Sequence, residues 1–198
     1  MIALIDYGAG NLTSVKKALA AVGADTLVPQ RPEDLADALG IIVPGVGHFG
    51  ATARLQGAWS EAILARVGEG RPLLGICLGM QWLFESSDEA PDVPGLGLLA
   101  GRCYKLPASG VKIPHVGWND LHIEQGSSIL DGVASESQVY FTHSYVAPAT
   151  QDTSATTEHG TRFAAVVQRG YIAGVQFHPE KSGEVGLQIL RNFLAMVG

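Results

Sequence analysis

A cysteine stands between two glycines in the segment Leu73-Leu74-Gly75-Ile76-Cys77-Leu78-Gly79. The apolar run before it predicts a strand, and a helix is expected from Leu78 through Phe84. This is the order of a nucleophile elbow, with cysteine in place of serine. Such a turn needs small neighbours, exposes the sulfur at the carboxyl end of the strand, and favours the reactive thiolate through the helix dipole. The alternative is a buried cysteine that acts only as a small hydrophobic residue.

Strands and helices are expected to alternate through the first half of the chain. The expected strands are Ile2–Ile5, Thr26–Val28, Ile41–Val43 and Leu73–Ile76. Helical spacing follows the first strand, with Gly23 as the stop; a short helix is expected over Pro32–Leu39, and a helical region up to about Glu69. Because these strands are continuously apolar, they indicate a parallel sheet covered by helices on both faces.

The second half has a different character. The expected strands are Val111–Ile123, Gln138–Thr142, Phe163–Val167 and Ile172–Phe177, with few helices between them. They predict antiparallel additions to the sheet. An amphipathic helix closes the chain, with Val185, Ile189, Leu190, Phe193, Leu194 and Val197 on one face. We therefore expect a single α/β domain over residues 1–198, with a mixed, mostly parallel sheet.

Composition limits the classes of function. The 198 residues are 46% hydrophobic and 16% charged, which suits a buried core and argues against disorder. The formal charge is −6, and no run of Lys or Arg stands out, so no nucleic-acid partner is expected. We also expect no secretory signal, no membrane span, no metal or other cofactor, and a soluble cytoplasmic protein. Two cysteines are too few for a disulfide framework.

A candidate base for Cys77 lies near the end of the chain, in Gln176-Phe177-His178-Pro179-Glu180. Pro179 favours an extended conformation at His178, and residues two apart in an extended segment point the same way. Glu180 could then orient the imidazole of His178 as the third member of a triad. A bare His-x-Glu is a weak pattern, and His143 is the nearest rival base.

The loop Pro44-Gly45-Val46-Gly47-His48-Phe49-Gly50 follows another expected strand. Glycines let backbone N–H groups turn toward a ligand, so this loop could face the same crevice as Cys77. An ordinary strand-to-helix turn is the alternative.

Together these elements resemble the class I (triad) glutamine amidotransferases, and more narrowly the glutaminase subunits of imidazole glycerol phosphate synthases. The resemblance covers nearly the whole chain. Besides the segments above, it rests on Ile5-Asp6-Tyr7-Gly8-Ala9-Gly10-Asn11-Leu12, Pro114-His115-Val116-Gly117-Trp118-Asn119, Tyr140-Phe141-Thr142-His143-Ser144-Tyr145 and His178-Pro179-Glu180-Lys181-Ser182. Many relatives have Pro-Gly-Gly where this chain has Pro44-Gly45-Val46.

The resemblance implies a flavodoxin-like fold and a Cys77, His178 and Glu180 triad that hydrolyses glutamine to glutamate and ammonia. It further implies two sets of residues. The oxyanion would be held by N–H groups of Leu78 and of the Gly45–Val46 loop. The amino-acid end of glutamine would be handled by Gln81, Glu89, Ser144 and Tyr145. Glu89 could instead be a solvated loop carboxylate, whereas Gln81 lies one helical turn beyond Cys77 on the same face.

A partner is also implied, because the chain is used up by one domain and ammonia needs an acceptor. The resemblance names a (β/α)8-barrel cyclase subunit, forming a heterodimer in histidine biosynthesis. Candidates for the docking face are Asn11, Trp118, Asn119 and Lys181, although a surface lysine is more often only solvated. The resemblance also suggests that the oxyanion loop at Gly45–Val46 must flip when the cyclase is occupied.

Three other interpretations remain open at this point. One is a different class I amidotransferase, such as the glutaminase subunit of pyridoxal phosphate synthase. The second is a cysteine peptidase or a redox-sensing protein with an elbow cysteine. The third is a non-catalytic subunit that kept the fold.

Overall fold

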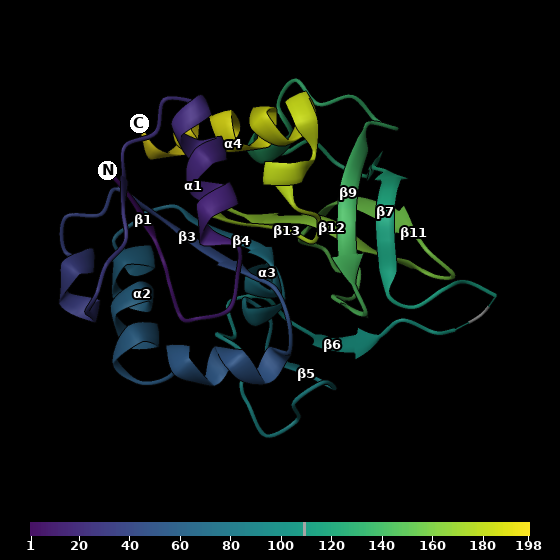
Figure 1. The fold of residues 1–198 in the computed structure, drawn as a ribbon, viewed down its shortest axis with the longest axis horizontal. Helices are drawn as coiled ribbons and strands as arrows, with labels where there is room; N and C mark the ends of the chain where they lie inside the picture. Colours follow the sequence, from purple (N-terminus) through teal and green to yellow (C-terminus); the bar gives the residue numbers. More distant parts are fainter. Residues whose placement is uncertain (109) are drawn as a thin grey trace.

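The computed structural model describes residues 1–108 and 110–198. Its main sheet has eight strands and lies in the middle of the molecule (Figure 1). In spatial order the strands are β2 (Thr26–Leu27), β1 (Ile2–Leu4), β3 (Gly40–Gly45), β4 (Leu73–Cys77), β13 (Ile172–Val175), β12 (Arg162–Arg169), β11 (Thr153–Glu158) and β8 (His122–Ile123). The first five are parallel and the last three are antiparallel, which confirms the expected mixed α/β sheet with its additions in the second half.

Helices cover both faces of this sheet. The α-helices are α1 (Leu12–Ala21), α2 (Ala58–Gly68), α3 (Leu78–Trp82) and α4 (Gly183–Val197), and the 3-10 helices are η1 (Pro32–Leu35), η2 (Phe49–Leu55), η3 (Ser128–Leu130) and η4 (Pro179–Lys181). In Figure 1, α1 and α4 lie on one side of the sheet, and α2 and α3 on the other. The helix expected over residues 32–39 is shorter, since only η1 forms there.

The side chains on the two faces of each parallel strand pack into two separate hydrophobic cores. Ile42 packs in the core beneath α1 and α4, whereas its neighbours Ile41 and Val43 pack in the core on the α2 side. All three side chains are fully buried. Strand residues alternate between faces, so a sheet that is covered on both sides needs apolar residues at every position. This is why continuously apolar runs identified these strands.

Two smaller sheets stand beside the main one. β7 (His115–Asp120) and β9 (Gln138–His143) form an antiparallel pair, at the right of Figure 1. β10 (Tyr145–Val146), β6 (Arg102–Lys105) and β5 (Ser86–Ser87) form a three-stranded sheet. Among the described residues, no helix is both long and apolar enough to cross a membrane.

Candidate active site

Cys77 is the last residue of β4, and α3 begins at the next position. Its backbone has φ 53° and ψ −106°, a conformation that is strained for a residue with a side chain. The neighbouring glycines make this turn possible. A Cβ on Gly75 would lie 2.6 Å from the carbonyl oxygen of Gly79, and a Cβ on Gly79 would lie 1.7 Å from that of Val43. The small residues expected around the elbow are therefore required by its packing.

His178 reaches the same end of the sheet because β13 runs parallel to β4, with Val175 in register with Ile76. The carboxyl ends of the two strands therefore lie side by side. The Nδ1 of His178 is 2.8 Å from Oε1 of Glu180, and both side chains are only 2% exposed. The backbone is extended at His178 but turns into η4 directly afterwards. A 3-10 turn, rather than the expected extended segment, thus brings Glu180 beside the ring.

The surroundings of His178 favour its cationic form. Burial acts to lower the pKa of the imidazole, but contact with the Cys77 sulfur and the hydrogen bond that Nδ1 donates to Glu180 outweigh it and raise the pKa to about 10. Among the described residues, Nε2 of His178 has no hydrogen-bond partner, although it is buried. The Glu180 carboxylate therefore holds Nδ1 of the ring. The ring also interacts with the Cys77 sulfur, but Nε2 forms no hydrogen bond with it.

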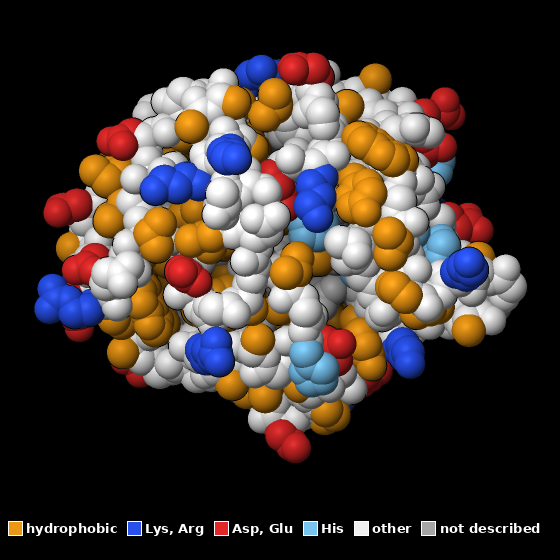
Figure 2. Space-filling view, in the orientation of Figure 1, with side chains coloured by type: hydrophobic (Ala, Val, Ile, Leu, Met, Phe, Trp, Pro, Cys, Tyr) orange, Lys and Arg blue, Asp and Glu red, His pale blue; other side chains and the backbone are white. Residues whose placement is uncertain are grey.

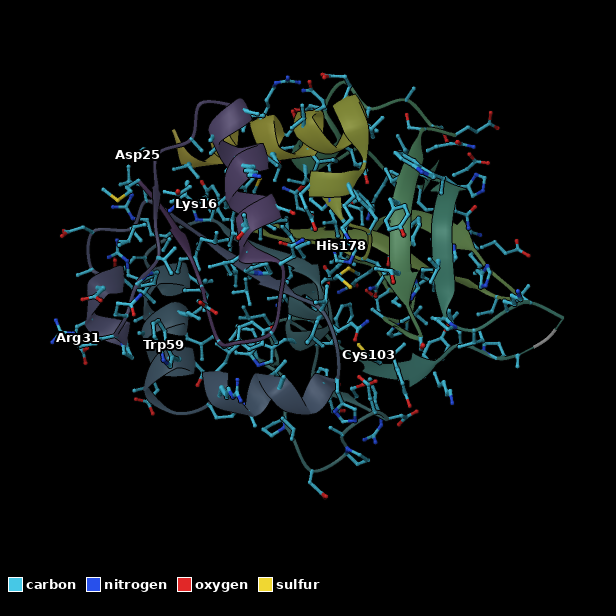
Figure 3. The ribbon with its side chains drawn as sticks, viewed as in Figure 1. Lys16, Asp25, Arg31, Trp59, Cys103 and His178 are labelled. Atoms are coloured by element: carbon cyan, nitrogen blue, oxygen red, sulfur yellow. The ribbon has the colours of Figure 1, made fainter. Side chains whose placement is uncertain are left out.

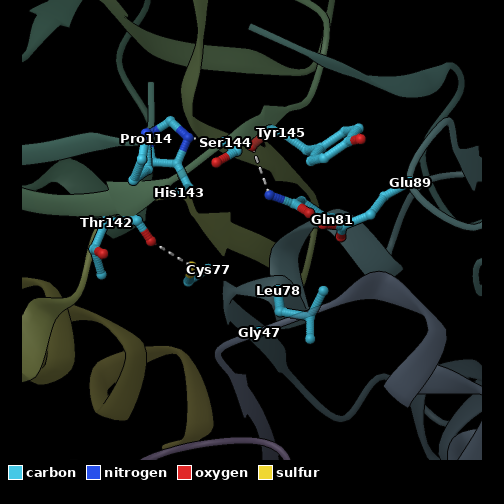
Figure 4. Close-up of a pocket in the computed structure, with 10 residues that line it drawn as sticks. All are labelled: Gly47, Cys77, Leu78, Gln81, Glu89, Pro114, Thr142, His143, Ser144 and Tyr145. Atoms are coloured by element: carbon cyan, nitrogen blue, oxygen red, sulfur yellow. Dashed lines mark hydrogen bonds between the residues drawn. The ribbon is translucent and has the colours of Figure 1, made fainter. Parts of the chain in front are cut away.

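A cavity of about 210 Å³ opens beside Cys77 (Figure 4). Five of the residues that the resemblance implied line it together with the cysteine: Leu78, Gln81, Glu89, Ser144 and Tyr145. The loop after β3 contributes Gly47 to this lining. Gly45 is two residues before Gly47 and is paired in register with Cys77, and Val46 lies between the two glycines in the sequence. Most of the predicted site residues thus converge on one space, although they come from distant parts of the chain.

The side chain of Gln81 is held from two sides. Its Nε2 donates to the carbonyl oxygen of Tyr145 at 2.8 Å and to Oε1 of Gln176 at 3.1 Å. The Nε2 of Gln176 in turn lies 3.7 Å from the Cys77 sulfur. Gln176 is fully buried, and sequence reasoning assigned it no role. Its position directly after the strand that neighbours Cys77 is the signal that could have identified it.

Glu89 is not a freely solvated carboxylate. Its Oε2 accepts a hydrogen bond of 2.7 Å from the backbone N–H of Phe49, at the start of η2. This bond ties the segment after α3 and β5 to the start of η2, which follows the loop at Gly47. The alternative interpretation of Glu89 as a solvated loop residue does not fit this contact.

The rival base His143 also lines the cavity, but its surroundings differ from those of His178. Burial, together with the nearby His115, lowers the pKa of His143 to about 3. Its Nδ1 is 3.1 Å from the carbonyl oxygen of Tyr145 and its Nε2 is 3.1 Å from Nδ1 of His115. Both ring nitrogens are thus engaged, which favours His178 as the base.

The second cysteine lies apart from this arrangement. Cys103 is on β6 and is fully buried, and its sulfur is 3.7 Å from the carbonyl oxygen of Gln81. Figure 3 labels both Cys103, on β6, and His178, which follows β13. Burial raises the pKa of the Cys103 thiol, which disfavours the reactive thiolate.

The four docking candidates fall into two groups. Trp118 is 54% exposed and its ring packs edge-on against Tyr140, while Lys181 places its Nζ 5.6 Å from the Tyr140 ring centroid. Asn11 caps α1 by accepting a hydrogen bond from the N–H of Ser14. Asn119 is half-buried and donates to the carbonyl oxygen of Glu158 at 2.9 Å.

Comparisons with known proteins identify the family of this chain. The family model described as glutamine amidotransferase class-I matches residues 3–197. The chain therefore belongs to the class-I glutamine amidotransferase family.

Curated relatives show to which group within this family the chain belongs. The chain is 46% identical to imidazole glycerol phosphate synthase subunit HisH of Methanothermobacter thermautotrophicus, over 100% of this chain and 99% of that protein. It is 48% identical to the subunit of the same name from Desulfitobacterium hafniense, over 98% of this chain and 93% of that protein. Within the family, the chain thus belongs with the HisH subunits of imidazole glycerol phosphate synthase.

Solved structures share the fold at lower identity. A glutamine amidotransferase crystal structure has a TM-score of 0.78 and 21% identity, with all of both chains covered. The structure of PurLQS from Thermotoga maritima has a TM-score of 0.76 and 19% identity, covering 100% of this chain and 98% of that chain. These likenesses concern the fold alone.

Proposed function

We propose that the chain hydrolyses glutamine at Cys77 and that a partner subunit uses the ammonia to make imidazole glycerol phosphate. Family membership and the HisH relatives support this activity and pathway. The observation that carries the assignment of residues is the position of Cys77, which ends its strand beside the cavity and next to the His178–Glu180 pair. Because the elbow strains the backbone of Cys77, this conformation is maintained by the packing around it.

The first half of the reaction forms a thioester. The Cys77 thiolate attacks the carboxamide carbon of glutamine, and the carbonyl electrons move onto oxygen. The oxyanion is received by the backbone N–H of Leu78 and by an N–H of the Gly45–Val46 loop. Imidazolium His178 then gives its Nε2 proton to the amide nitrogen, the C–N bond breaks, and ammonia leaves. The raised pKa of His178 supports its protonation before the attack.

The second half releases glutamate and restores the enzyme. Neutral His178 takes a proton from water, and the resulting hydroxide attacks the thioester carbon. The C–S bond then breaks, which returns the thiolate and the imidazolium. Glu180 stabilises the cationic ring in both halves through its bond to Nδ1. The net reaction is glutamine plus water to glutamate plus ammonia.

The hydrogen bonds at the cavity indicate how glutamine is oriented. The two bonds from Nε2 use both amide hydrogens of Gln81, so the atom that it offers to a ligand is its acceptor oxygen. Glu89 offers a carboxylate, which is also an acceptor. Two acceptors suit the ammonium group of glutamine, and the Ser144 hydroxyl is a donor for its carboxylate. Tyr145 contributes through its carbonyl oxygen, which holds Gln81.

The partner that we propose is a (β/α)8-barrel cyclase subunit. The surface that we propose for it is the hairpin face, defined as Val116, Trp118, Tyr140 and Lys181. Val116 is 56% exposed and Trp118 is 54% exposed, which is unusual for such large apolar side chains. Figure 2 shows hydrophobic side chains gathered over the β7 and β9 strands. Lys181 directly follows Glu180, so contact at this face is one residue away from the triad.

Alkylation with a glutamine analogue tests the site. Mass spectrometry after exposure to a chloroketone analogue should place the label on Cys77, and the cyclase subunit should accelerate labelling. Ammonia release should occur from glutamine but not from peptides, which separates this chemistry from that of a cysteine peptidase. A Cys77→Ser variant should lose glutamine-dependent synthesis and keep ammonia-dependent synthesis by the assembled pair.

Cys103→Ser is the matched control, and it should be labelled at the rate of the unmodified chain. Label on Cys103, or glutamine-dependent synthesis that persists in Cys77→Ser, would contradict the assignment.

A further inference from the structure

Three side chains link β7 and β9 to the active-site cavity by consecutive hydrogen bonds. Nδ1 of His143 is 3.1 Å from the carbonyl oxygen of Tyr145, and its Nε2 is 3.1 Å from Nδ1 of His115. The Nε2 of His115 is 3.3 Å from Nδ2 of Asn119. His115 and His143 are opposite each other in the register of the two strands, so their side chains share the inner face of the pair.

One assignment of protons fits all of these contacts. The Tyr145 carbonyl can only accept, so Nδ1 of His143 carries the hydrogen and, in the neutral ring, Nε2 accepts. His115 must then donate from Nδ1, which leaves its own Nε2 to accept from the amide of Asn119. The second amide hydrogen of Asn119 goes to the carbonyl oxygen of Glu158 at 2.9 Å, which fixes the orientation of that amide. In each of the three bonds that lead from Asn119 to Tyr145, the donor is therefore the group on the Asn119 side.

The environment keeps both rings neutral. His115 is 4% exposed and His143 is 7% exposed. His115 is stacked between Phe141, at 4.8 Å between ring centroids, and His159, at 4.1 Å. Burial, with His159 nearby, lowers the pKa of His115 to about 4, and burial lowers that of His143 to about 3. Near neutral pH neither ring carries a charge, so each hydrogen bond keeps the same donor and acceptor.

The series of hydrogen bonds ends at the Tyr145 carbonyl, which is part of the proposed glutamine site. The Tyr145 carbonyl that accepts from His143 also accepts from Gln81, whose amide reaches Gln176 and, through it, the Cys77 sulfur. We propose that Asn119, His115 and His143 are positioning residues that hold the Tyr145 carbonyl, and with it Gln81, in the geometry that binds glutamine. This inference rests on the proposed glutamine hydrolysis. It gives Asn119 a role inside the protein in place of the docking role expected for it, because its amide bonds to His115 and to the Glu158 carbonyl.

The same strand carries the hairpin face on its other side. Val116 and Trp118 alternate along β7 with His115 and Asn119 and point outward. A displacement of β7 at the hairpin face would therefore move Asn119 and His115, where the series of hydrogen bonds begins. The hydrogen bonds then provide a direct physical connection between the hairpin face and the cavity.

Steady-state kinetics of the assembled pair tests the proposal. His115→Phe keeps the stacking surface but removes both hydrogen-bonding nitrogens. It should raise KM for glutamine by about tenfold, as expected for the loss of one buried hydrogen bond, and change kcat by less than about twofold. His115→Asn retains a donor near the position of Nδ1 and should recover most of the affinity. His122→Phe, on the exposed side of β8, is the matched control.

An unchanged KM in His115→Phe, or an equal rise in His122→Phe, would overturn the proposal. Long-range ¹⁵N–¹H NMR of the unmodified chain gives a readout that needs neither activity nor a variant. It should show both rings as the neutral Nδ1–H tautomer at pH 7. A cationic ring, or the Nε2–H tautomer at either residue, would also overturn the proposal. Absence of glutamine hydrolysis by the unmodified pair would instead refute the proposed function, because the tautomers remain measurable.

Discussion

The imidazole of His178 and the carboxylate of Glu180 form a 2.8 Å hydrogen bond that is almost completely shielded from solvent. Two residues apart in the chain, they meet because Pro179 begins a 3-10 turn. Together with Cys77 the carboxylate holds the pKa of His178 at about 10, against an ordinary value of 6.5, despite the burial of the ring.

This raised pKa has a consequence for stability. Above pH 6.5 the unfolded chain loses the His178 proton, whereas the folded chain keeps it up to about pH 10. The unfolded state then binds fewer protons, so the free energy of unfolding should fall as pH rises through this window. Glu180→Gln should reduce the fall by roughly 1 kcal/mol between pH 6.5 and 8.5. Urea unfolding at several pH values measures it.

The window ends at pH 8.5 because ordinary thiols titrate around that pH and phenols above it. Glu184→Gln, at a side chain that is 84% exposed, should keep the slope of the unmodified chain. Parallel curves for Glu180→Gln and the unmodified chain would show that the carboxylate does not hold the proton.

Gly79→Ala should destabilise the fold strongly. The added Cβ would lie 1.7 Å from the carbonyl oxygen of Val43, which is backbone of a fully buried strand and cannot move aside. We expect a loss of at least about 2 kcal/mol in the free energy of unfolding, by the cost of overpacking. Gly68→Ala is the control: a Cβ there meets no atom within 4 Å, so stability should rise by roughly 0.5 kcal/mol. Equal stability of the two variants would refute the steric argument.

Gln176→Leu should lower kcat/KM for glutamine by roughly 10- to 100-fold, because it removes hydrogen-bonding groups beside the charged Cys77 thiolate. The variant loses the amide beside the Cys77 sulfur and the acceptor for Gln81. Alkylation of Cys77 by iodoacetamide should slow as well, since the thiolate loses a donor. Gln30→Leu, at an exposed residue, should match the unmodified chain in both assays. Normal kinetics in Gln176→Leu would mean that its contacts are only structural.

Trp118→Ser should weaken binding of the cyclase subunit by roughly 30-fold or more, as expected for a central aromatic residue of an interface. Tyr171→Ser is a matched control, because Tyr171 is 57% exposed but precedes β13 at the opposite end of the sheet. It should change the dissociation constant by less than about twofold. Calorimetric titration measures both, and similar affinities for the two variants would exclude the hairpin face.

Lys181→Ala tests the connection between docking and catalysis separately. It should reduce the stimulation of glutamine hydrolysis by cyclase ligand, because Lys181 lies next to Glu180 in the chain and above Tyr140 in space. A variant that binds the cyclase and responds to its ligand normally would remove Lys181 from the proposal.

Some strands were not expected because their sequences do not look buried. β11 reads Thr153-Ser154-Ala155-Thr156-Thr157-Glu158, and its first five residues are at most 5% exposed. Polar residues in a strand usually indicate a solvated face, but here both faces are covered. Small hydroxyl side chains fit such a position if they hydrogen-bond locally, as Thr156 does with Glu124. Only the position of the strand within the sheet reveals this burial.

What the sequence determined by itself is local. Continuously apolar runs, glycines around Cys77 and a proline after His178 set the strands, the elbow and the turn, because backbone sterics act over a few residues. The choice between His143 and His178, the role of Gln176 and the inward amide of Asn119 depended on the tertiary structure. Hydrogen-bond partners and burial set the charge of an imidazole, and these come from strands that are far apart in the chain.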